Sequence, residues 1–472
     1  MRSIPNTSVA TSSTSPVMLV LFIGVLMGAL DIAIVGPALP AIQKSFGVDE
    51  RASAWVFTMY VLFNLIGTPL MAKLSDRFGR RSIYVLDVSL FAIGSLLVAI
   101  SPNFAVLLIG RAIQAFGAGG IFPVASAVIG DTFPPEKRGA ALGLIGAVFG
   151  MAFLIGPLLA AALIGFGWHW LFLINLPIAA LVIVLSLRVL PTVRSLEPKA
   201  FDWPGVLSLG ALLASVALAV SQLDSKNLFS SLISVRVWPL LLVAAVLVWV
   251  FSTLERRAED PVIHPKLLGS RQVVLTTIFA AGAGLGEAGM VFLPALAVAA
   301  LGMSTQSSSF MLLPVVLALA IGSPLAGRML DRVGSRAVVI AGLLCLVVGT
   351  GVYWLLAASL AWFIVAGAFV GFGLAALLGA PLRYILLNEA PASDRAAAQG
   401  LLTVFTSIGQ LISGALVGAI AASQGGGAVG YQAAFLAIGA VAAVMTVLAF
   451  NLKSKDEERS SIEGKNEPSI TS

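Results

Sequence analysis

The sequence carries little charge for its length. Of its 472 residues only 11% are Asp, Glu, Lys or Arg, whereas 59% are hydrophobic. A soluble domain has about 25% charged residues, because its surface must stay hydrated. No water-soluble fold of this length hides so much apolar surface, so lipid must surround most of the exterior. The low charge therefore excludes an ordinary soluble protein.

Residues that carry chemistry are also scarce. The single cysteine, Cys345, excludes an internal disulfide framework. The two histidines, His169 and His264, lie in no ligand-like cluster, so we expect neither a metal site nor a cofactor. The sequence has no Gly-x-x-x-x-Gly-Lys-Ser/Thr loop, which argues against an ATP-driven pump. It offers no nucleophile–base arrangement, so we expect no catalytic residue and no enzyme. A net charge of +6 is too small to indicate nucleic acid binding.

Long apolar runs dominate what is present. A run of roughly 20 residues spans the ~30 Å of membrane hydrocarbon, and about fourteen runs reach that length. They are Val17–Ile42, Ser53–Ala72, Ile83–Ile100, Phe104–Ile129, Ala140–Phe166, Trp168–Leu190, Trp203–Leu223, Val237–Leu254, Val273–Leu301, Phe310–Ala326, Ala337–Leu356, Leu360–Leu387, Ala396–Ala422 and Tyr431–Leu452. We therefore expect an all-α, polytopic membrane protein.

The polar segments set its orientation. Residues 1–16 and 453–472 are low in apolar residues and are predicted to be disordered tails. Nearly all Lys and Arg residues lie in alternate loops, on the side that also carries both tails. Because cytoplasmic loops are rich in Lys and Arg, both termini are expected in the cytoplasm of a multi-pass protein of the cell membrane.

An internal repeat relates the two ends of the chain. The loop Lys73-Leu-Ser-Asp76-Arg77-Phe-Gly79-Arg80-Arg81 is repeated downstream as Arg328-Met-Leu-Asp331-Arg332-Val-Gly334-Ser335-Arg336. At nearly the same spacing, Pro37-Ala38-Leu39 is matched by Pro294-Ala295-Leu296. Ordered matches of this kind indicate two parallel six-helix bundles, residues 17–190 and 273–452. Residues 203–254 have no counterpart and are predicted to be two inserted helices.

These features resemble the major facilitator superfamily and, within it, the fourteen-helix drug:proton antiporters. The loop 73–81 is similar to the signature between helices 2 and 3, and Ile109–Gly117 is similar to the fourth-helix motif. The segment Gly146–Pro157, with Gly146, Gly150, Gly156 and Pro157, is similar to the antiporter motif of helix 5. Leu30–Pro40 and Phe172–Pro177 look like the signatures of helices 1 and 6.

The resemblance implies export by alternating access, in which protons enter as amphipathic or cationic small molecules leave. An exporter of an endogenous metabolite or lipid-like compound is the alternative. The resemblance also implies a cytoplasmic latch between the bundles in the outward-open state. Its residues would be Asp76, Arg77, Gly79, Arg80, Arg81, Asp131, Asp331 and Arg332. The expected partners are substrate, protons and the lipid bilayer, and the chain is expected to act as a monomer.

Charges within the apolar runs are the candidate proton-coupling residues. A charge at the centre of a membrane helix costs at least ~2.5–3.5 kcal/mol and is functional by default. Asp31 and Glu287 occupy nearly equivalent positions in the two bundles, and Arg111 differs from Asp31 in depth by only about 6 Å. We expect both carboxylates to line the central cavity, with Arg111 switching the protonation of the carboxylate. Desolvation disfavours a charged carboxyl whereas a nearby arginine favours it. A permanent Asp31–Arg111 pair that only fixes packing is the alternative.

Another charged residue within an apolar run is Asp87. Asp87 lies near the start of its run, where we expect it to be solvated at the cytoplasmic face and to have a structural role.

Apolar drugs are bound by aromatic and methionine surfaces. The candidate substrate contacts are Met27, Phe57, Tyr60, Asn64, Gln114, Met290, Phe292 and Phe405. Each of these residues could instead serve only in helix packing.

Two other classes of membrane protein fit less well. A channel would not need duplicated halves with latch loops, and transport that saturates with substrate would separate the two. A receptor or scaffold would leave the intramembrane carboxylates of both halves without a purpose.

Overall fold

The computed structural model describes residues 14–192, 202–258, 261, 267–390 and 395–458, in which it contains helices and no strand. The first bundle consists of α1 (Thr14–Phe46), α2 (Glu50–Phe78), α3 (Arg80–Ala99), α4 (Phe104–Thr132), α5 (Pro135–Leu163), α6 (His169–Leu173) and α7 (Asn175–Val189). The inserted segment consists of α8 (Trp203–Ser221), the short α9 (Leu228–Leu232) and α10 (Trp238–Glu255). The second bundle consists of α11 (Arg271–Gly289), α12 (Leu293–Leu301), α13 (Thr305–Ser308), α14 (Leu313–Val333), α15 (Ser335–Leu356), α16 (Leu360–Leu378), α17 (Ala380–Glu389), α18 (Arg395–Ser423) and α19 (Gly427–Ala449).

The lengths of these helices fit a membrane. Within the described residues, 13 helical segments are long and apolar enough to cross one. The helix α5 adds a further candidate, because its 29 residues cover about 44 Å at ~1.5 Å per residue. Several spans are interrupted where proline removes a backbone donor, as at Pro294 in the first turn of α12 and Pro381 in the first turn of α17. The prediction of an all-helical protein with about fourteen spans is confirmed.

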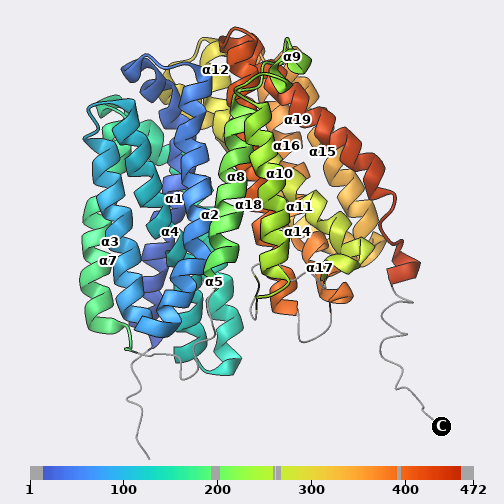
Figure 1. Cartoon of the computed structure of the whole chain (residues 1–472). Helices are drawn as coiled ribbons and strands as arrows, with labels where there is room; N and C mark the ends of the chain where they lie inside the picture. Colours follow the sequence, from blue (N-terminus) through green and yellow to red (C-terminus); the bar gives the residue numbers. More distant parts are fainter. Residues whose placement is uncertain (1–13, 193–201, 259–260, 262–266, 391–394, 459–472) are drawn as a thin grey trace, which may run out of the picture.

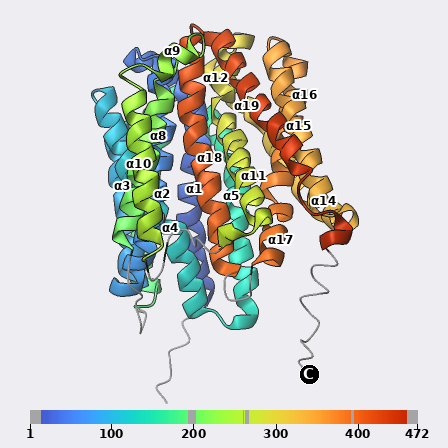
Figure 2. The same ribbon diagram turned by 45° about the vertical axis from the view of Figure 1, so that its right-hand side comes forward.

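The two bundles stand side by side, with the inserted helices in front of the seam between them (Figure 1). The helix α8 packs against α2 of the first bundle and α18 of the second, and Figure 2 shows the same arrangement from another side. The first residues of α1 and the last residues of α19 lie at the same end, the lower end in Figure 1. We call this the terminal end, and the other the opposite end.

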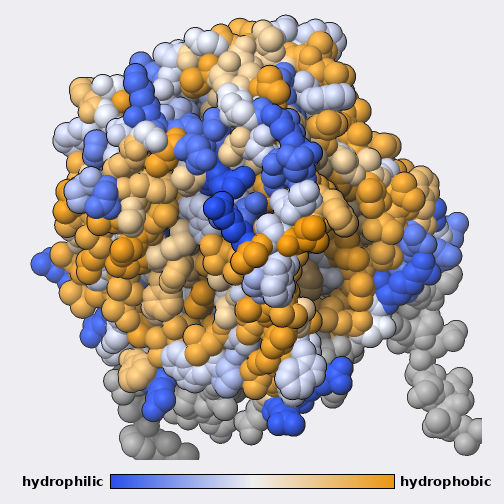
Figure 3. Space-filling view, turned by 45° about the horizontal axis from the view of Figure 1, so that its top comes forward, coloured by the Kyte–Doolittle hydropathy of each residue, from blue (hydrophilic) through white to orange (hydrophobic). Residues whose placement is uncertain are grey.

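The surface is divided as a membrane requires. Hydrophobic residues cover most of the sides, whereas hydrophilic residues gather at the opposite end, which is turned forward in Figure 3. Large apolar side chains are exposed along α10, including Trp249 at 69% and Leu242 at 56%. Contiguous apolar surface of this kind is not stable in water. It is the surface that faces lipid.

Part of each segment that was predicted to be a disordered tail lies within the described fold. Residues 1–13 and 459–472 lie outside the described residues, but Thr14–Pro16 already belong to α1. The segment from Lys453 to Glu458 contacts the second bundle: Lys453 pairs with Glu389, and Glu458 accepts hydrogen bonds from Ser335. The prediction of disorder from residue 453 is therefore wrong for these six residues, because their charges find partners on the bundle.

Candidate functional site

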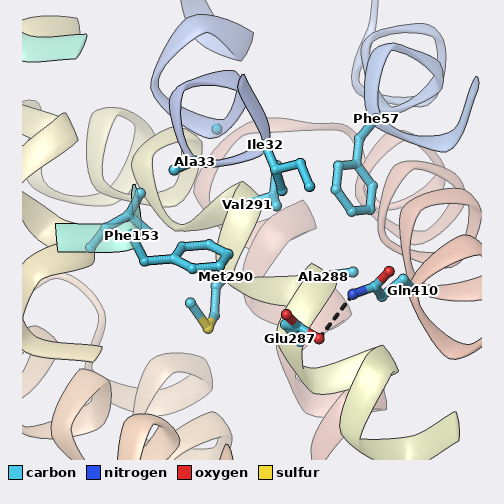
Figure 4. Close-up of a pocket in the computed structure, with 11 residues that line it drawn as sticks. Ile32, Ala33, Phe57, Phe153, Glu287, Ala288, Met290, Val291 and Gln410 are labelled. Carbon is cyan, nitrogen blue, oxygen red and sulfur yellow. Dashed lines mark hydrogen bonds between the residues drawn. The ribbon is translucent and has the colours of Figure 1, made fainter. Parts of the chain in front are cut away.

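A cavity of about 240 Å³ lies between the two bundles. Its walls come from α1, α2, α4 and α5 on one side and from α11 and α18 on the other. The lining residues are Val25, Gly28, Ala29, Ile32, Phe57, Tyr60, Val61, Asn64, Thr68, Ala118, Gly119, Ile121, Phe122, Pro123, Phe153, Glu287, Thr403, Ser407 and Gln410. A pocket of about 20 Å³, shown in Figure 4, adjoins it and shares Glu287, Gln410 and several apolar residues. The surface offered to a ligand is mostly apolar and aromatic.

The bundles meet beyond this cavity, toward the opposite end. A Cβ on Gly36 of α1 would lie 2.6 Å from the Val291 carbonyl oxygen, so the backbones of the two bundles are in contact there. Gly418 of α18 packs in the same way on Ala54 of α2. The cavity-lining residues of α2 and α18 lie closer to the terminal end than these contacts do. In the part of the chain that the structure describes, the bundles are therefore in contact at the opposite end, and the cavity lies on the terminal side of these contacts.

Glu287 is the charged side chain of this cavity. Among the described residues that line the two pockets, it alone is Asp, Glu, Lys or Arg. Its Oε2 accepts a hydrogen bond of 2.9 Å from the Gln410 amide, as Figure 4 shows. The prediction that Glu287 lines the central cavity agrees with this placement.

Small residues bring these two side chains together. A Cβ on Gly284 of α11 would lie 1.9 Å from the Thr406 carbonyl oxygen, and a Cβ on Gly409 of α18 would lie 1.8 Å from that of Ala281. Such close approach of two backbones in a membrane requires glycine. The glycines thus set the distance between Glu287 and Gln410.

Replacement of Gly284 by valine should therefore destabilise the protein. The added side chain overlaps the α18 backbone, and overpacking of this kind costs about 1–3 kcal/mol or more. We expect a lower melting temperature in detergent, measured by the loss of the monodisperse peak in size-exclusion chromatography. The matched control is Gly351→Val on α15, where nothing lies within 4 Å of the added Cβ. An equal effect of both changes would contradict this explanation.

Asp31 lies in a separate buried network inside the first bundle. Arg111 Nη1 donates to its Oδ2 at 2.7 Å, and both side chains are 0% exposed. The Gln114 amide donates to Oδ1 at 2.7 Å and the Asn175 amide donates to the same atom at 3.2 Å. Both amides also donate to the hydroxyl of Ser95. Two helices, α4 and α7, thus supply three donors to the carboxylate of Asp31, and Ser95 of α3 joins the two amides.

Arg111 is held by several groups at once. Its Nη1 also donates to Gln114 Oε1 at 2.6 Å, and its Nε donates to the Val56 carbonyl oxygen at 3.1 Å. The guanidinium lies 4.3 Å from the centre of the Tyr60 ring. Cation–π contacts strengthen when both groups are shielded from water. The charge of Arg111 therefore has a counter-ion and an aromatic neighbour in the buried site, whereas its Nη2 has no hydrogen-bond partner among the described residues.

The prediction that Asp31 lines the central cavity is wrong for this conformation. Gly28, Ala29 and Ile32 turn toward the cavity, whereas Asp31 points to α4 on another face of α1. Helical rotation of 100° per residue separates these neighbours. Tyr60, which lines the cavity and also covers Arg111, connects the two sites.

Of the eight predicted substrate contacts, four line the cavity or its adjoining pocket and four do not. Phe57, Tyr60, Asn64 and Met290 line the cavity or its adjoining pocket. The others do not line it. Met27 and Phe292 are buried, Gln114 belongs to the Asp31 network, and Phe405 packs on the core. These four therefore do not line the cavity in this conformation, because residue type does not fix which helix face a side chain occupies, and their role as substrate contacts stays a prediction.

Some lining residues were missed by the sequence analysis. Thr403, Ser407 and Gln410 form one polar face of α18, with spacings of four and three residues that place them on the same side of a helix. That spacing within an apolar run was an available signal. Phe122 and Phe153 carry no such signal, because phenylalanine is equally common on lipid-facing surfaces.

The loop 73–81 forms a charge cluster within the first bundle. Arg80 pairs with Asp76 at 2.5 Å and with Asp131 at 2.9 Å, and Arg81 donates to the Leu187 carbonyl oxygen at 3.2 Å. Gly79 has φ of 96°, a backbone conformation that favours glycine. Asp131, one of the predicted latch residues, thus pairs with this loop, and these contacts all lie within one bundle.

The repeated loop in the second bundle has different partners. Gly334 has φ of 84°, so the turn is the same as at Gly79. The Arg332 carbonyl oxygen accepts a hydrogen bond from Lys455, and Asp331 lines a small pocket with Lys455 and Glu458. Arg77 lies exposed at the terminal end of α2, over the ring of Phe78. A role of these loops as a latch remains a prediction.

The segment similar to the antiporter motif lies in α5. A Cβ on Gly156 would come 2.5 Å from that of Ala33, so this glycine allows α5 to approach α1 beside the cavity. Pro157 lies inside the helix. Gly146 and Gly150 belong to the same helix, at positions whose packing lies outside what the structure describes.

Comparisons with known proteins agree with this architecture of two bundles around a central cavity. A sequence model of the Major Facilitator Superfamily matches residues 21–297 and 273–472. The chain belongs to this superfamily, and it is a multi-pass membrane transporter and not an enzyme.

Its relatives include bacterial transporters and multidrug resistance proteins. The uncharacterized MFS-type transporter YfiU of Bacillus subtilis is 36% identical over 82% of this chain and 76% of that protein. Multidrug resistance protein 3 of B. subtilis is 33% identical over 73% of this chain and 67% of its own length. Multidrug resistance protein Stp of Mycobacterium tuberculosis is 31% identical over 85% and 74%.

Solved structures show the same fold at low identity. A bacterial homolog of the human lysosomal transporter Spinster has a TM-score of 0.68 at 17% identity and covers 98% of this chain and 100% of its own. The nucleoside transporter NupG has a TM-score of 0.68 at 12% identity, covering 92% and 99%.

Proposed function

We propose that this protein is a proton-coupled antiporter that exports amphipathic or cationic small molecules by alternating access. The observation that carries the proposal is one carboxyl group, Glu287, in an otherwise uncharged, aromatic cavity between two bundles. Such a cavity suits a cation with an apolar body, because aromatic faces attract positive charge and apolar walls bind the rest. The names of the multidrug resistance relatives support the same substrate class.

The coupling follows from competition at Glu287. The ionised carboxylate of Glu287 attracts a cationic substrate. Protonation neutralises the carboxylate and so disfavours binding of the cation. A cycle in which one replaces the other exchanges a proton for a cation. Gln410 keeps a hydrogen bond to the carboxyl during the exchange and holds it toward the cavity.

The Asp31–Arg111 pair would act behind the cavity wall. Tyr60 contacts the guanidinium and lines the cavity, so movement of α2 against α4 changes the surroundings of the pair. We assign Asp31 and Arg111 a part in coupling through this link. Both termini would lie in the cytoplasm, which makes the described conformation inward-facing, and the monomer would be the working unit.

The first test uses proteoliposomes with an acidic lumen and a clamped membrane potential. The panel contains permanently charged lipophilic cations, because weak bases accumulate in acidic vesicles without a carrier, together with neutral and anionic compounds of similar size. Saturable uptake of cations with proton loss from the lumen supports the proposal. Exchange limited to anionic or lipid-like compounds would favour the alternative substrate class. Proton loss from the lumen that is the same with and without every compound of the panel would contradict antiport.

Alternating access also predicts an effect at the opposite end. Glu50 of α2 accepts a hydrogen bond of 3.0 Å from the Gly427 backbone N–H, which joins the two bundles there. Glu50→Ala removes this contact and should favour states in which the opposite ends separate. A loss of about 1 kcal/mol changes a two-state ratio about fivefold.

Distances between spin labels measure this shift. In a Cys345→Ser background, labels at Lys44→Cys and Val429→Cys report the separation of the two bundles. The control is Asp49→Asn, which alters the neighbouring carboxylate but retains a side chain able to cap α2. A distance distribution that is the same in Glu50→Ala and in the control would show that the contact does not hold the seam closed.

A further inference from the structure

Asp87 is a second buried carboxyl group of the first bundle, and the mechanism above does not use it. It lies on α3 with a side chain that is 0% exposed, although the sequence predicted that it would be solvated. Neither of its carboxyl oxygens has a hydrogen-bond partner among the described residues. The prediction of solvation is wrong because α4 covers this face of α3.

Glycine makes room for the group. A Cβ on Gly120 of α4 would lie 2.1 Å from Asp87 Oδ2 and 2.3 Å from its Cγ, so the carboxyl lies directly against the α4 backbone. The adjacent residues Gly119 and Ile121 line the substrate cavity. Asp87 therefore lies behind the wall that a bound substrate would touch.

Among the residues that the structure describes, those packed directly against Asp87 carry no positive charge. From α3 the nearest titratable group is Tyr84, whose hydroxyl is also buried without a partner and packs against Gly24 of α1. The facing residues of α4 are Gly117 and Gly120. On α7, which packs on α3, Ser186 has a buried hydroxyl without a partner.

Two charged side chains of the neighbouring helices are paired elsewhere, and a third is exposed. Arg80, nearer the start of α3, is held by Asp76 of α2 and Asp131 of α4. Arg111 of α4 is held by Asp31 of α1. Arg188 on α7 is exposed beyond Ser186, at the terminal end of its helix.

Asp31 provides the comparison within the same bundle. It is equally buried, but it has a guanidinium and two amide donors. A buried carboxylate with no counter-ion and no donor is strongly disfavoured, whereas a neutral carboxylic acid is tolerated far better. The two aspartates thus differ in the charge that their surroundings permit.

We propose that Asp87 is a second proton-binding site, which holds a proton on its carboxyl oxygen in this conformation. The proton passes to water from the terminal end during the transport cycle. The buried hydroxyls of Tyr84 and Ser186 lie on that side of Asp87. The role in transport rests on the proposed antiport, but occupancy of the site does not.

Occupancy is tested on the purified full chain without substrate or gradient. Infrared spectra at neutral pH should contain the carbonyl stretch of a buried, protonated carboxyl, and Asp87→Asn should remove a component of it. Asparagine has the shape of the neutral acid, so this variant should keep the melting temperature of the parent. Asp31→Asn, the matched control, should leave that component in place and lower the melting temperature, because it leaves Arg111 without its carboxylate.

Two results would overturn the proposal. One is an infrared band that Asp87→Asn leaves unchanged, and the other is a loss of stability in Asp87→Asn as large as that in Asp31→Asn. If occupancy holds, Asp87→Asn should lower the number of protons exchanged per cation at unchanged cation affinity. An unchanged ratio would remove Asp87 from the transport cycle, whether or not Glu287 couples.

Discussion

Replacing Glu287 with glutamine is expected to abolish cation accumulation driven by a pH gradient. The amide cannot bind and release the proton, and it removes the negative charge from the cavity. A tenfold loss of cation affinity corresponds to only about 1.4 kcal/mol. The contact of a cation with the Glu287 carboxylate in a site shielded from water is expected to contribute more than that. The measurement is initial uptake of a permanently charged cation by proteoliposomes with an acidic lumen.

The control for Glu287 comes from the same cavity. Ser407→Ala changes a neutral lining residue of α18 and should leave uptake within about twofold, a change below 0.5 kcal/mol. Glu287→Asp keeps an ionisable group and should retain part of the pH-driven uptake. Full activity of Glu287→Gln, with normal expression, would exclude this residue as the coupling carboxyl.

The second large effect is expected at the Asp31–Arg111 pair. Asp31→Asn leaves Arg111 buried without its carboxylate, and breaking one side of a buried pair costs about 3–5 kcal/mol. The double variant Asp31→Asn with Arg111→Gln removes both charges, so it should recover most of the stability. Thermal unfolding in detergent measures this part of the prediction.

Transport by the double variant separates the two roles of the pair. If Asp31 and Arg111 take part in coupling, the double variant is stable but still fails to accumulate cations against their gradient. If the pair serves packing alone, transport returns together with stability. The second result would contradict the coupling role assigned here and leave Glu287 as the coupling residue.

The fold could be predicted from the sequence because the membrane sets a length for each apolar run. Runs such as Phe104–Ile129 correspond to single helices whose ends differ by a few residues, as in α4. The breaks within spans were harder to predict. Membrane helices tolerate proline in some positions, as Pro69 within α2 shows, whereas Pro294 begins a new helix.

The site was only partly predictable, since sequence gives depth in the membrane better than rotation about a helix axis. Glu287 and Asp31 have similar depths, but one faces the cavity and the other faces Arg111. The partners Ser95, Gln114 and Asn175 come from three different helices. No spacing along the chain connects them, so only the packing of these helices reveals the network.

One measurement tests the central claim of proton antiport most directly. Proteoliposomes are loaded with a lipophilic cation, diluted into buffer of the same pH with the membrane potential clamped, and followed with a pH-sensitive dye in the lumen. As the cation leaves down its gradient, the protein should carry protons inward and acidify the lumen, and Glu287→Gln should abolish this signal. A lumen that stays at constant pH, or becomes alkaline, while the cation leaves through the protein would contradict antiport.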